Sequence, residues 1–275
     1  MADPRPIGVF DSGVGGLTVA RALLDLLPDE RIVYFGDTAR GPYGPRTLAE
    51  VRGFVDELLG WLADADAKLV VAACNTATAA ALEPATGFVV SSPVPVVGVI
   101  RPAVTAAARA TRRGRVGVIG TQATIASGSY ERAFAALAPG VEVVSRACPA
   151  FVAFVEEGRT TDPEVLAQVR DDLAPLVAAQ VDTVILGCTH YPLLTGALAY
   201  VLGPQVVLVS SAEETARRVV AHLVDRDMLT DRPAGDHRFV ASGDPAAFKA
   251  LAIRFLGPRV AAVDVEHPWR ELASP

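Results

Sequence analysis

The chain has 275 residues, which suits one large domain or two of moderate size, and it carries a net charge of −6. This acidic balance argues against a nucleic-acid partner, and every long apolar stretch is interrupted before it could cross a membrane. Three cysteines and an N-terminus without a signal-peptide core indicate free thiols in a reducing cytoplasm.

Apolar runs of strand length alternate along the chain with segments of helical period. The predicted strands are Ile7–Asp11, Ile32–Gly36, Leu69–Cys74, Val94–Val99, Val116–Gly120, Val141–Ser145, Thr183–Cys188 and Val206–Ser210. The predicted helices are Gly16–Leu27, Thr47–Ala63, Pro102–Ala110, Pro163–Ala179 and Ala212–Leu223. A capping box formed by Ser211 and Glu214 indicates the start of the last helix. This alternation predicts an α/β fold with mainly parallel sheets flanked by helices.

The chain repeats this pattern once at low resolution. The segment Ile7–Ser12 resembles Val116–Thr121, because each is a predicted buried strand that ends in a hydroxyl residue. Each is followed, after a similar interval, by a strand that ends in a cysteine. The repeat predicts two similar α/β lobes that face each other across a cleft.

The connections between the lobes can also be placed on the sequence. Gly98–Pro102 is the expected crossing point, and the strand at Val206 is expected to cross back. The first lobe would then contain residues 1–98 plus 207–275, and the second lobe residues 99–206.

Two of the cysteines stand at the ends of predicted buried strands. Cys74 and Cys188 each precede a predicted helix start, where backbone N–H groups and the helix dipole should lower the pKa of a thiol. Ligands of open α/β sheets bind beyond the carboxyl ends of the strands, so both thiols are expected to face one cleft. Two such thiols can remove a proton from one face of a substrate and return it to the other, as a racemase requires. Cys148 is interpreted as a buried structural residue.

Other readings of the cysteines fit less well. A zinc site built from the three cysteines and His190 has suitable ligand types, but it lacks a Cys-x-x-Cys pair. Protease-like catalysis by a cysteine and a histidine needs one thiol and not two on duplicated lobes. We therefore expect no metal.

Cofactor binding is also disfavoured. The Gly-rich segment Asp11–Gly16 is neither a dinucleotide fingerprint nor a Walker sequence, although its N–H groups suit a carboxylate. The chain has only two lysines, Lys68 and Lys249, and neither lies in a motif. A pyridoxal-phosphate enzyme needs a Schiff-base lysine in its site, so we expect no cofactor.

Five segments together resemble the glutamate racemases of the aspartate/glutamate racemase family. They are Gly8–Thr18 (GVFDSGVGGLT), Gly36–Gly44 (GDTARGPYG), Ala73–Thr76 (ACNT), Gly117–Thr124 (GVIGTQAT) and Leu186–Leu194 (LGCTHYPLL). The resemblance extends from about residue 7 to about residue 224. It implies a cofactor-independent enzyme that interconverts L- and D-glutamate and supplies D-glutamate for peptidoglycan. It also implies two α/β lobes with the site between them, and a homodimer.

The same resemblance assigns roles to individual residues. Cys74 and Cys188 match the two catalytic acid/bases, and Asp11, His190 and Glu156 match charged groups that assist them, with Glu157 as an alternative to Glu156. The positions that match the family's substrate site are Asp11, Ser12, Tyr43, Gly44, Asn75, Thr76, Thr121, Thr124, Thr189 and His190. Any of the hydroxyl residues could instead cap a helix.

Three readings of the function remain open on the sequence. The first is a glutamate racemase, and the second is a racemase of aspartate or another acidic amino acid. Pocket size separates these two, and a sequence does not measure it. The third is a non-catalytic, two-lobed carboxylate-binding protein with inert thiols. A polar residue beside each of Cys74 and Cys188 argues against this third reading.

Overall fold

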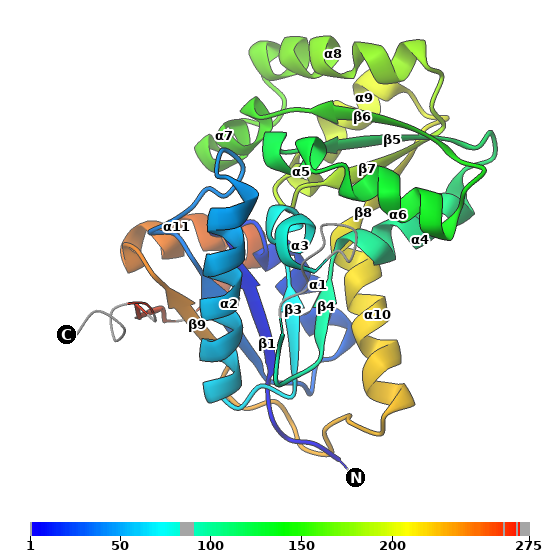
Figure 1. Cartoon of the computed structure of the whole chain (residues 1–275). Coiled ribbons are helices and arrows are strands. Elements are labelled where there is room, and N and C mark those ends of the chain that lie inside the picture. The colour runs from blue at the N-terminus through cyan, green and yellow to red at the C-terminus, as the bar shows by residue number, and fades with distance from the viewer. Residues whose placement is uncertain (1, 83–90, 261, 268, 270–275) are drawn as a thin grey trace.

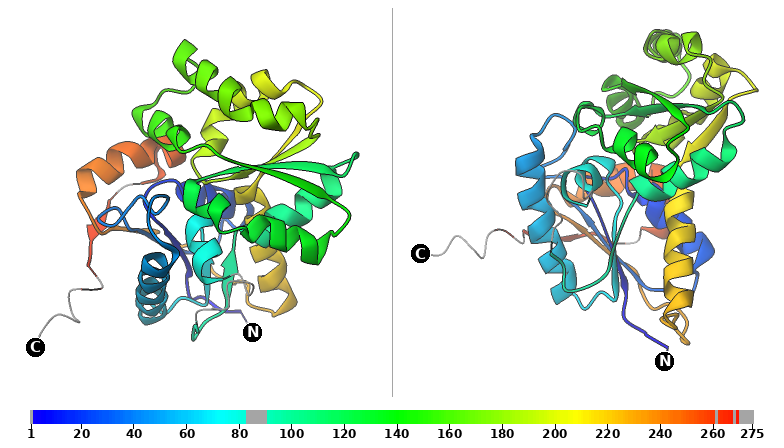
Figure 2. Two further views of the ribbon diagram at one scale, coloured as in Figure 1. Left: turned by 45° about the horizontal axis from the view of Figure 1, so that its top comes forward. Right: turned by 45° about the vertical axis from the view of Figure 1, so that its right-hand side comes forward.

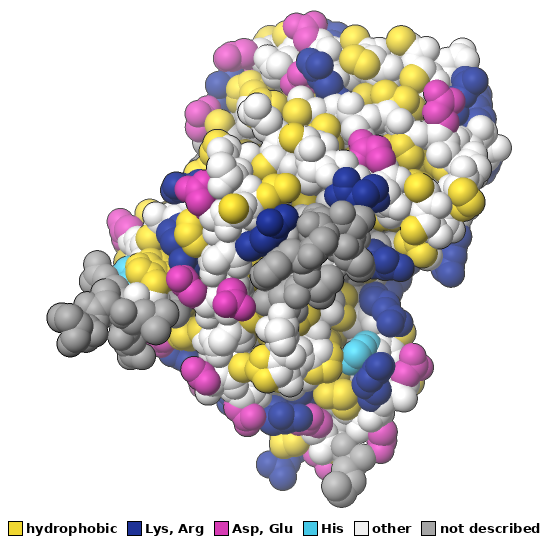
Figure 3. All heavy atoms as spheres, viewed as in Figure 1, with side chains coloured by type: hydrophobic (Ala, Val, Ile, Leu, Met, Phe, Trp, Pro, Cys, Tyr) yellow, Lys and Arg dark blue, Asp and Glu magenta, His cyan; other side chains and the backbone are white. Residues whose placement is uncertain are grey.

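The chain forms two α/β lobes, each built on one parallel sheet (Figures 1 and 2). The structure, a computed structural model, describes residues 2–82, 91–260, 262–267 and 269. The predicted α/β fold class is confirmed. Within these residues, every helix is too short or too polar to span a membrane. Acidic and basic side chains both occur on the two lobes over the face shown in Figure 3.

The first sheet has six strands in the order β10-β9-β2-β1-β3-β4. Its strands are β1 (Ile7–Asp11), β2 (Ile32–Gly36), β3 (Leu69–Ala72), β4 (Val96–Gly98), β9 (Arg238–Ala241) and β10 (Asp264–Val265). The helices around it are α1 (Leu17–Leu26), α2 (Leu48–Asp64), α3 (Asn75–Ala81), α10 (Ser211–Asp225) and α11 (Pro245–Leu256), followed by the 3₁₀ turn η3 (Gly257–Arg259). Successive side chains of a strand point to opposite faces. Ile7 and Val9 therefore pack in one core with α1, α10 and α11, whereas Phe10 packs in another with α2 and α3.

The second sheet has four strands in the order β6-β5-β7-β8. Its strands are β5 (Arg115–Gly120), β6 (Glu142–Ala147), β7 (Thr183–Gly187) and β8 (Val207–Ser210). The helices of this lobe are α4 (Ile100–Ala110), α5 (Gln122–Ala126), α6 (Ser129–Leu137), α7 (Ala150–Glu157), α8 (Pro163–Ala178), η2 (Tyr191–Leu194) and α9 (Thr195–Leu202). Strand β5 pairs with β7 from Val116 to Gly120, so the ends of these two strands are level.

One predicted connection is wrong. The strand at Val206 does not return to the first sheet, because β8 pairs in parallel with β7 through Thr183 and Val207. The chain returns one element later, through α10, which contacts α1. Strands β9 and β10 then extend the first sheet beyond β2, so that this sheet combines strands from both ends of the chain.

Two helix starts also differ from prediction, because α4 begins at Ile100 and not at Pro102, and the capping of α10 is not as expected. The N-cap of α10 is Ser210, whose hydroxyl accepts a hydrogen bond from Ala212 N (3.3 Å), so Ser211 lies inside the helix and the predicted capping box is absent. A complete capping box opens α2 instead. Thr47 Oγ1 accepts from Glu50 N (3.3 Å), and a Glu50 carboxylate oxygen accepts from Thr47 N (3.0 Å).

A buried ion pair lies at the amino end of the first sheet. Lys68 Nζ is 2.7 Å from Glu30 Oε2, and the two side chains are 0% and 2% exposed. The Lys68 ammonium also donates to the carbonyl oxygens of Asp3 and Met228, each at 2.7 Å. The ion pair and the two hydrogen bonds of this ammonium thus join three separate segments of the first lobe directly before β3.

Candidate active site

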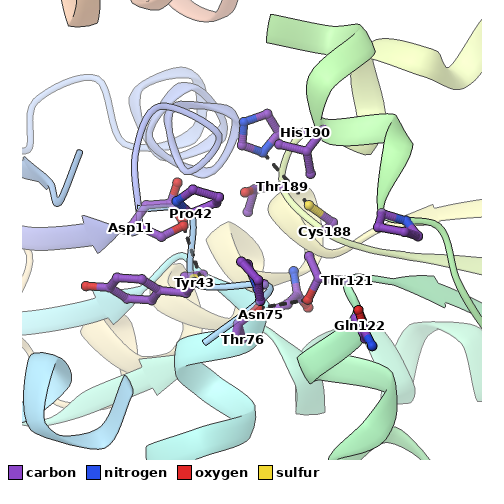
Figure 4. Close-up of a pocket in the computed structure, with 16 residues that line it drawn as sticks. Asp11, Pro42, Tyr43, Asn75, Thr76, Thr121, Gln122, Cys188, Thr189 and His190 are labelled. Atoms are coloured by element: carbon purple, nitrogen blue, oxygen red, sulfur yellow. Dashed lines mark hydrogen bonds between the residues drawn. The ribbon is translucent and has the colours of Figure 1, made fainter. Parts of the chain in front are cut away.

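A cavity of about 250 Å³ lies between the lobes, where the carboxyl ends of strands from both sheets meet (Figure 4). This is the expected place for a ligand of parallel α/β sheets. Its lining consists of Asp11, Ser12, Pro42, Tyr43, Gly44, Pro45, Cys74, Asn75, Thr76, Thr121, Gln122, Pro149, Val152, Cys188, Thr189 and His190. Of the residues predicted for the site, all but Thr124 and Glu156 line the cavity.

The cavity also has lining residues that the sequence analysis did not predict, and each lies close to a predicted residue or beyond a strand end. Pro42 and Pro45 flank the predicted Tyr43, and Gln122 follows Thr121 directly. Pro149 and Val152 come after the carboxyl end of β6, in the same position relative to the sheet as the predicted residues. The rule that ligands lie beyond strand ends could have located these last two.

The Cys74 thiol is buried at the start of α3. Cys74 is the N-cap of this helix, and its sulfur accepts a hydrogen bond from Ala77 N (3.5 Å) and donates to Ser12 Oγ (3.8 Å). Burial, reinforced by the negative charge of Asp11, raises the pKa of the Cys74 thiol, and the hydrogen bonds with Ala77 and Ser12 offset this only in part. The expectation of a lowered pKa is therefore wrong, because burial outweighs the hydrogen bond from the helix start, and Cys74 is protonated at neutral pH.

The Cys188 thiol has a different environment. The next helix is the short 3₁₀ turn at Tyr191, so no α-helix starts directly after Cys188 as was predicted. Its partner is the side chain of His190, whose Nδ1 is 3.8 Å from the sulfur (Figure 4). Burial lowers the pKa of His190, but hydrogen bonds with Cys188 and Glu156 outweigh burial and raise it to about 10. A protonated His190 places a positive charge beside the Cys188 sulfur.

Glu156, rather than Glu157, is the carboxylate that supports His190. Glu156 Oε1 is 3.1 Å from His190 Nε2, whereas Glu157 pairs with Arg159 at 3.4 Å. Glu156 is 43% exposed and lies outside the cavity lining, so it acts on the site through His190. The ring of Phe255, on α11, packs edge-on against His190 with 5.8 Å between the centroids.

Asp11 and Gly15 bring the first lobe close to His190. Asp11 is 1% exposed, and its Oδ2 accepts a hydrogen bond from Gly16 N (2.8 Å). A Cβ atom on Gly15 would lie 2.4 Å from His190 Nδ1, so only glycine allows this approach. On the same side, Thr18 Oγ1 donates to the carbonyl oxygen of Thr189 (3.2 Å).

Asn75 has one half of its amide fixed and the other half available. Tyr130 OH donates to Asn75 Oδ1 (2.7 Å), which orients the side chain. Asn75 Nδ2 is buried and has no hydrogen-bond partner among the residues that the structure describes. A buried donor of this kind is costly unless a ligand satisfies it, so Asn75 is suited to bind a substrate oxygen.

Three threonine hydroxyls connect the lobes beside Asn75. Thr76 Oγ1 lies 3.0 Å from Thr121 Oγ1 and 3.1 Å from Thr124 Oγ1, and the last two are 2.9 Å apart. Thr121 also caps α5, where it accepts from Thr124 N (3.3 Å). Thr124 is buried behind the other two and positions them, so the structure gives it no place in the cavity lining.

The remaining chemical groups named in the sequence lie away from the cavity. The Cys148 thiol is fully buried and donates to the carbonyl oxygen of Arg146 (3.7 Å). Neither Lys68 nor Lys249 lines the cavity. Among the described residues, no group of three or more His, Cys, Asp or Glu side chains is placed to hold a metal ion.

Comparisons with known proteins agree on one family. Residues 15–219 match the family model Asp/Glu/Hydantoin racemase. Over 265 residues the chain is 58% identical to a glutamate racemase of Beutenbergia cavernae, covering 93% of this chain and 90% of that protein.

Solved structures agree as well. A glutamate racemase of Bacillus anthracis superposes with a TM-score of 0.90 at 43% identity, covering 95% of this chain and 97% of that one. A glutamate racemase of Francisella tularensis, in complex with D-glutamate, superposes with a TM-score of 0.90 at 32% identity, covering 97% and 99%. The chain therefore belongs to the Asp/Glu/Hydantoin racemase family.

Proposed function

We propose that this protein interconverts L- and D-glutamate without a cofactor, with one thiolate removing the α-proton and a second thiol donating a different proton to the opposite face. The observation that carries the proposal is the pair of buried thiols, Cys74 from the first lobe and Cys188 from the second, that line one cavity. The choice of glutamate is supported by the relatives of Beutenbergia cavernae and Bacillus anthracis. A solved aspartate racemase and a solved aspartate racemase homologue are each 18% identical to this chain and bear on the fold alone.

The different environments of the two thiols suit the two halves of the reaction. In one direction the Cys188 thiolate, stabilised by protonated His190, removes the α-proton, and the Cys74 thiol donates a proton to the opposite face. In the other direction the roles are exchanged. The carbanion between these steps is stabilised by hydrogen bonds, which are stronger in an enclosed cavity than in water.

Neutral donors would bind the substrate carboxylates. The described residues that line the cavity include no lysine or arginine, and their polar side chains are amides and hydroxyls together with Asp11, His190 and the two thiols. Asn75 Nδ2 is the clearest donor, since it is buried and without a partner in the described chain. Ser12, Thr76, Thr121 and Thr189 supply the hydroxyls of this set.

Isotope incorporation tests the two-thiol mechanism. In deuterated buffer with L-glutamate alone, we expect solvent deuterium to enter D-glutamate first, while the recovered L-glutamate stays protiated early in the reaction. The reason is that the thiol that removes the proton is not the thiol that returns one. Mass spectrometry of the separated enantiomers measures this. Early deuterium in both enantiomers equally would contradict the mechanism, and racemisation of L-aspartate but not of L-glutamate would exclude the proposed substrate.

The charge on His190 should limit activity at high pH. We expect kcat/KM of the wild type to fall as the pH rises through about 10, because His190 then loses the proton that stabilises the Cys188 thiolate. The groups that raise the pKa of His190 are Cys188, Glu156 and Asp11. The pKa of folded His190 lies above its ordinary value of 6.5. Protonation of His190 therefore stabilises the folded protein fully below pH 6.5, and this stabilisation is lost as the pH rises through about 10.

The variant His190→Asn provides the comparison. We expect this variant to have a lower kcat/KM than the wild type at neutral pH, and its kcat/KM should not fall near pH 10. Its melting temperature should also decrease less than that of the wild type as the pH rises through about 10. Profiles of kcat/KM and of melting temperature against pH measure both effects. An unchanged alkaline limb in the variant would show that another group controls it.

The biological role that we propose is supply of D-glutamate for peptidoglycan, by a cytoplasmic homodimer. The resemblance of the five motifs to glutamate racemases supports this role. Growth of a bacterial strain that requires D-glutamate, restored by expression of the wild-type chain but not of Cys74→Ala, would agree with it. Failure of the wild type to restore growth would count against the role in D-glutamate supply. A monomer in light scattering would count against the homodimer.

A further inference from the structure

The loop after β2 forms one wall of the cavity without belonging to a helix or strand. Its residues Pro42, Tyr43, Gly44 and Pro45 line the cavity. The carbonyl oxygen of Gly44 also accepts a hydrogen bond from Ala123 N in the opposite lobe (3.1 Å). Because no strand ladder or helix holds this wall, individual contacts must fix its position.

Asp37 is the centre of those contacts. Its side chain is fully buried. Asp37 Oδ2 accepts hydrogen bonds from Tyr43 OH and from Arg40 Nε, the latter at 2.7 Å, while Oδ1 accepts from Ser242 Oγ at 2.8 Å. A buried carboxylate needs such donors, so the place of Asp37 decides the place of Tyr43.

Ser242 ties this loop to a distant part of the chain. It follows β9, 205 positions after Asp37, and is itself fully buried. Its hydroxyl donates to Asp37 and at the same time accepts from Ala39 N (2.9 Å), while its own N–H donates to the carbonyl oxygen of Gly36 (3.1 Å). One side chain thus fixes both the carboxylate and the backbone at the start of the loop.

We propose that Ser242 is a positioning residue for substrate binding, which acts by holding Asp37 and thereby Tyr43 and the 42–45 wall of the cavity. This inference rests on the proposed function, because it assumes that glutamate binds in this cavity. Ser242 lies outside residues 15–219, the part that matches the family model, so it is the structure that brings this segment to the site.

The variant Ser242→Ala tests the proposal. We expect KM for both enantiomers to rise by about tenfold, the order expected when a hydrogen bond to a charged group is lost, and kcat to change little, since both thiols are untouched. Ser242→Thr retains the hydroxyl and should restore KM. Ser145→Ala is the matched control, because Ser145 also donates to a carboxylate, that of Glu131, but away from the cavity.

Hydrogen exchange gives a second reading that does not depend on activity. Mass spectrometry should show faster exchange of the amides of residues 37–45 in Ser242→Ala than in the wild type, in Ser242→Thr or in Ser145→Ala. If the wild type does not racemise glutamate, the proposed function fails, yet this exchange pattern still decides whether Ser242 holds the loop.

Two results would overturn the proposal. One is a Ser242→Ala variant with the KM and the exchange of the wild type. The other is a loss of kcat that follows a loss of melting temperature, with no recovery in Ser242→Thr, since that pattern indicates a general structural role.

Discussion

Replacing Cys74 or Cys188 with alanine is expected to lower kcat/KM for glutamate racemisation, in both directions, by about 10²–10⁴-fold or more, the contribution of one positioned acid or base. Each thiol faces the cavity from its own lobe, and the carbanion needs a proton donor on each face. The fold should remain, because removal of a small buried side-chain group costs on the order of 1 kcal/mol. Polarimetry from both pure enantiomers, with circular dichroism and melting temperature, measures these effects.

Cys148→Ala is the matched control for these two variants. Its thiol is as deeply buried as the others but bonds to the Arg146 carbonyl oxygen outside the cavity, so this variant should racemise at the wild-type rate. A near wild-type rate in Cys74→Ala or Cys188→Ala would show that the two-thiol assignment is wrong. Equal loss in all three variants would instead indicate a general effect of removing buried thiols.

Lys68→Met is expected to destabilise the protein by about 3–5 kcal/mol, as found when one partner of a buried ion pair is removed. Methionine nearly fills the volume but leaves the Glu30 carboxylate, 2% exposed, without its ammonium partner. The carbonyl oxygens of Asp3 and Met228 lose a donor as well. Urea denaturation of the wild type and the variant measures the difference in free energy of unfolding.

Two further variants separate this effect from others. Lys249→Ala changes the other lysine of the chain, which is exposed on α11, and should alter the free energy of unfolding by less than about 0.5 kcal/mol. Lys68→Met combined with Glu30→Leu removes both charges and should recover much of the loss. If the double variant is less stable than Lys68→Met alone, the uncompensated charge is not the cause.

The sequence predicts the central strands of the fold well because both faces of these strands are buried. Continuous apolar runs mark such strands, so β1 and β2 begin and end at the predicted residues. The runs at β3 and β7 extend past the last paired residue, so that Cys74 and Cys188 fall just beyond the strands and not in them. This difference helps the site, since a side chain beyond the ladder is free to face the cavity.

The C-terminal part of the first lobe was missed for the opposite reason. Strand β9 has four residues, beside the two-residue edge strand β10, too short for a clear apolar pattern. Helix α11 did carry usable signals, since Asp244 caps it, Pro245 opens it and Gly257 follows its last residue. What those elements contact could not be read from the sequence, because Phe255 reaches His190 and Ser242 reaches Asp37 only in the folded chain.

Within the site, the identity of the residues was easier to predict than their electrostatics. Local spacing placed His190 beside Cys188, and the resemblance indicated Glu156. The state of Cys74 depends on how completely the lobes exclude water, and no local pattern encodes this. Helix position alone therefore gave the wrong direction for its pKa.

The hydrogen bonds that link Cys188 to His190 and His190 to Glu156 also connect that sulfur with the solvent, since Glu156 is partly exposed. The described partners of the Cys74 thiol are the N–H of Ala77 and the hydroxyl of Ser12, which is itself partly exposed. Each proposed conversion leaves the two sulfurs with exchanged protons, so the free enzyme has two proton isomers. Return to the starting isomer requires the Cys74 sulfur to gain a proton and the Cys188 sulfur to lose one, so at abundant substrate this recovery would compete with the chemistry on glutamate in setting the rate of turnover.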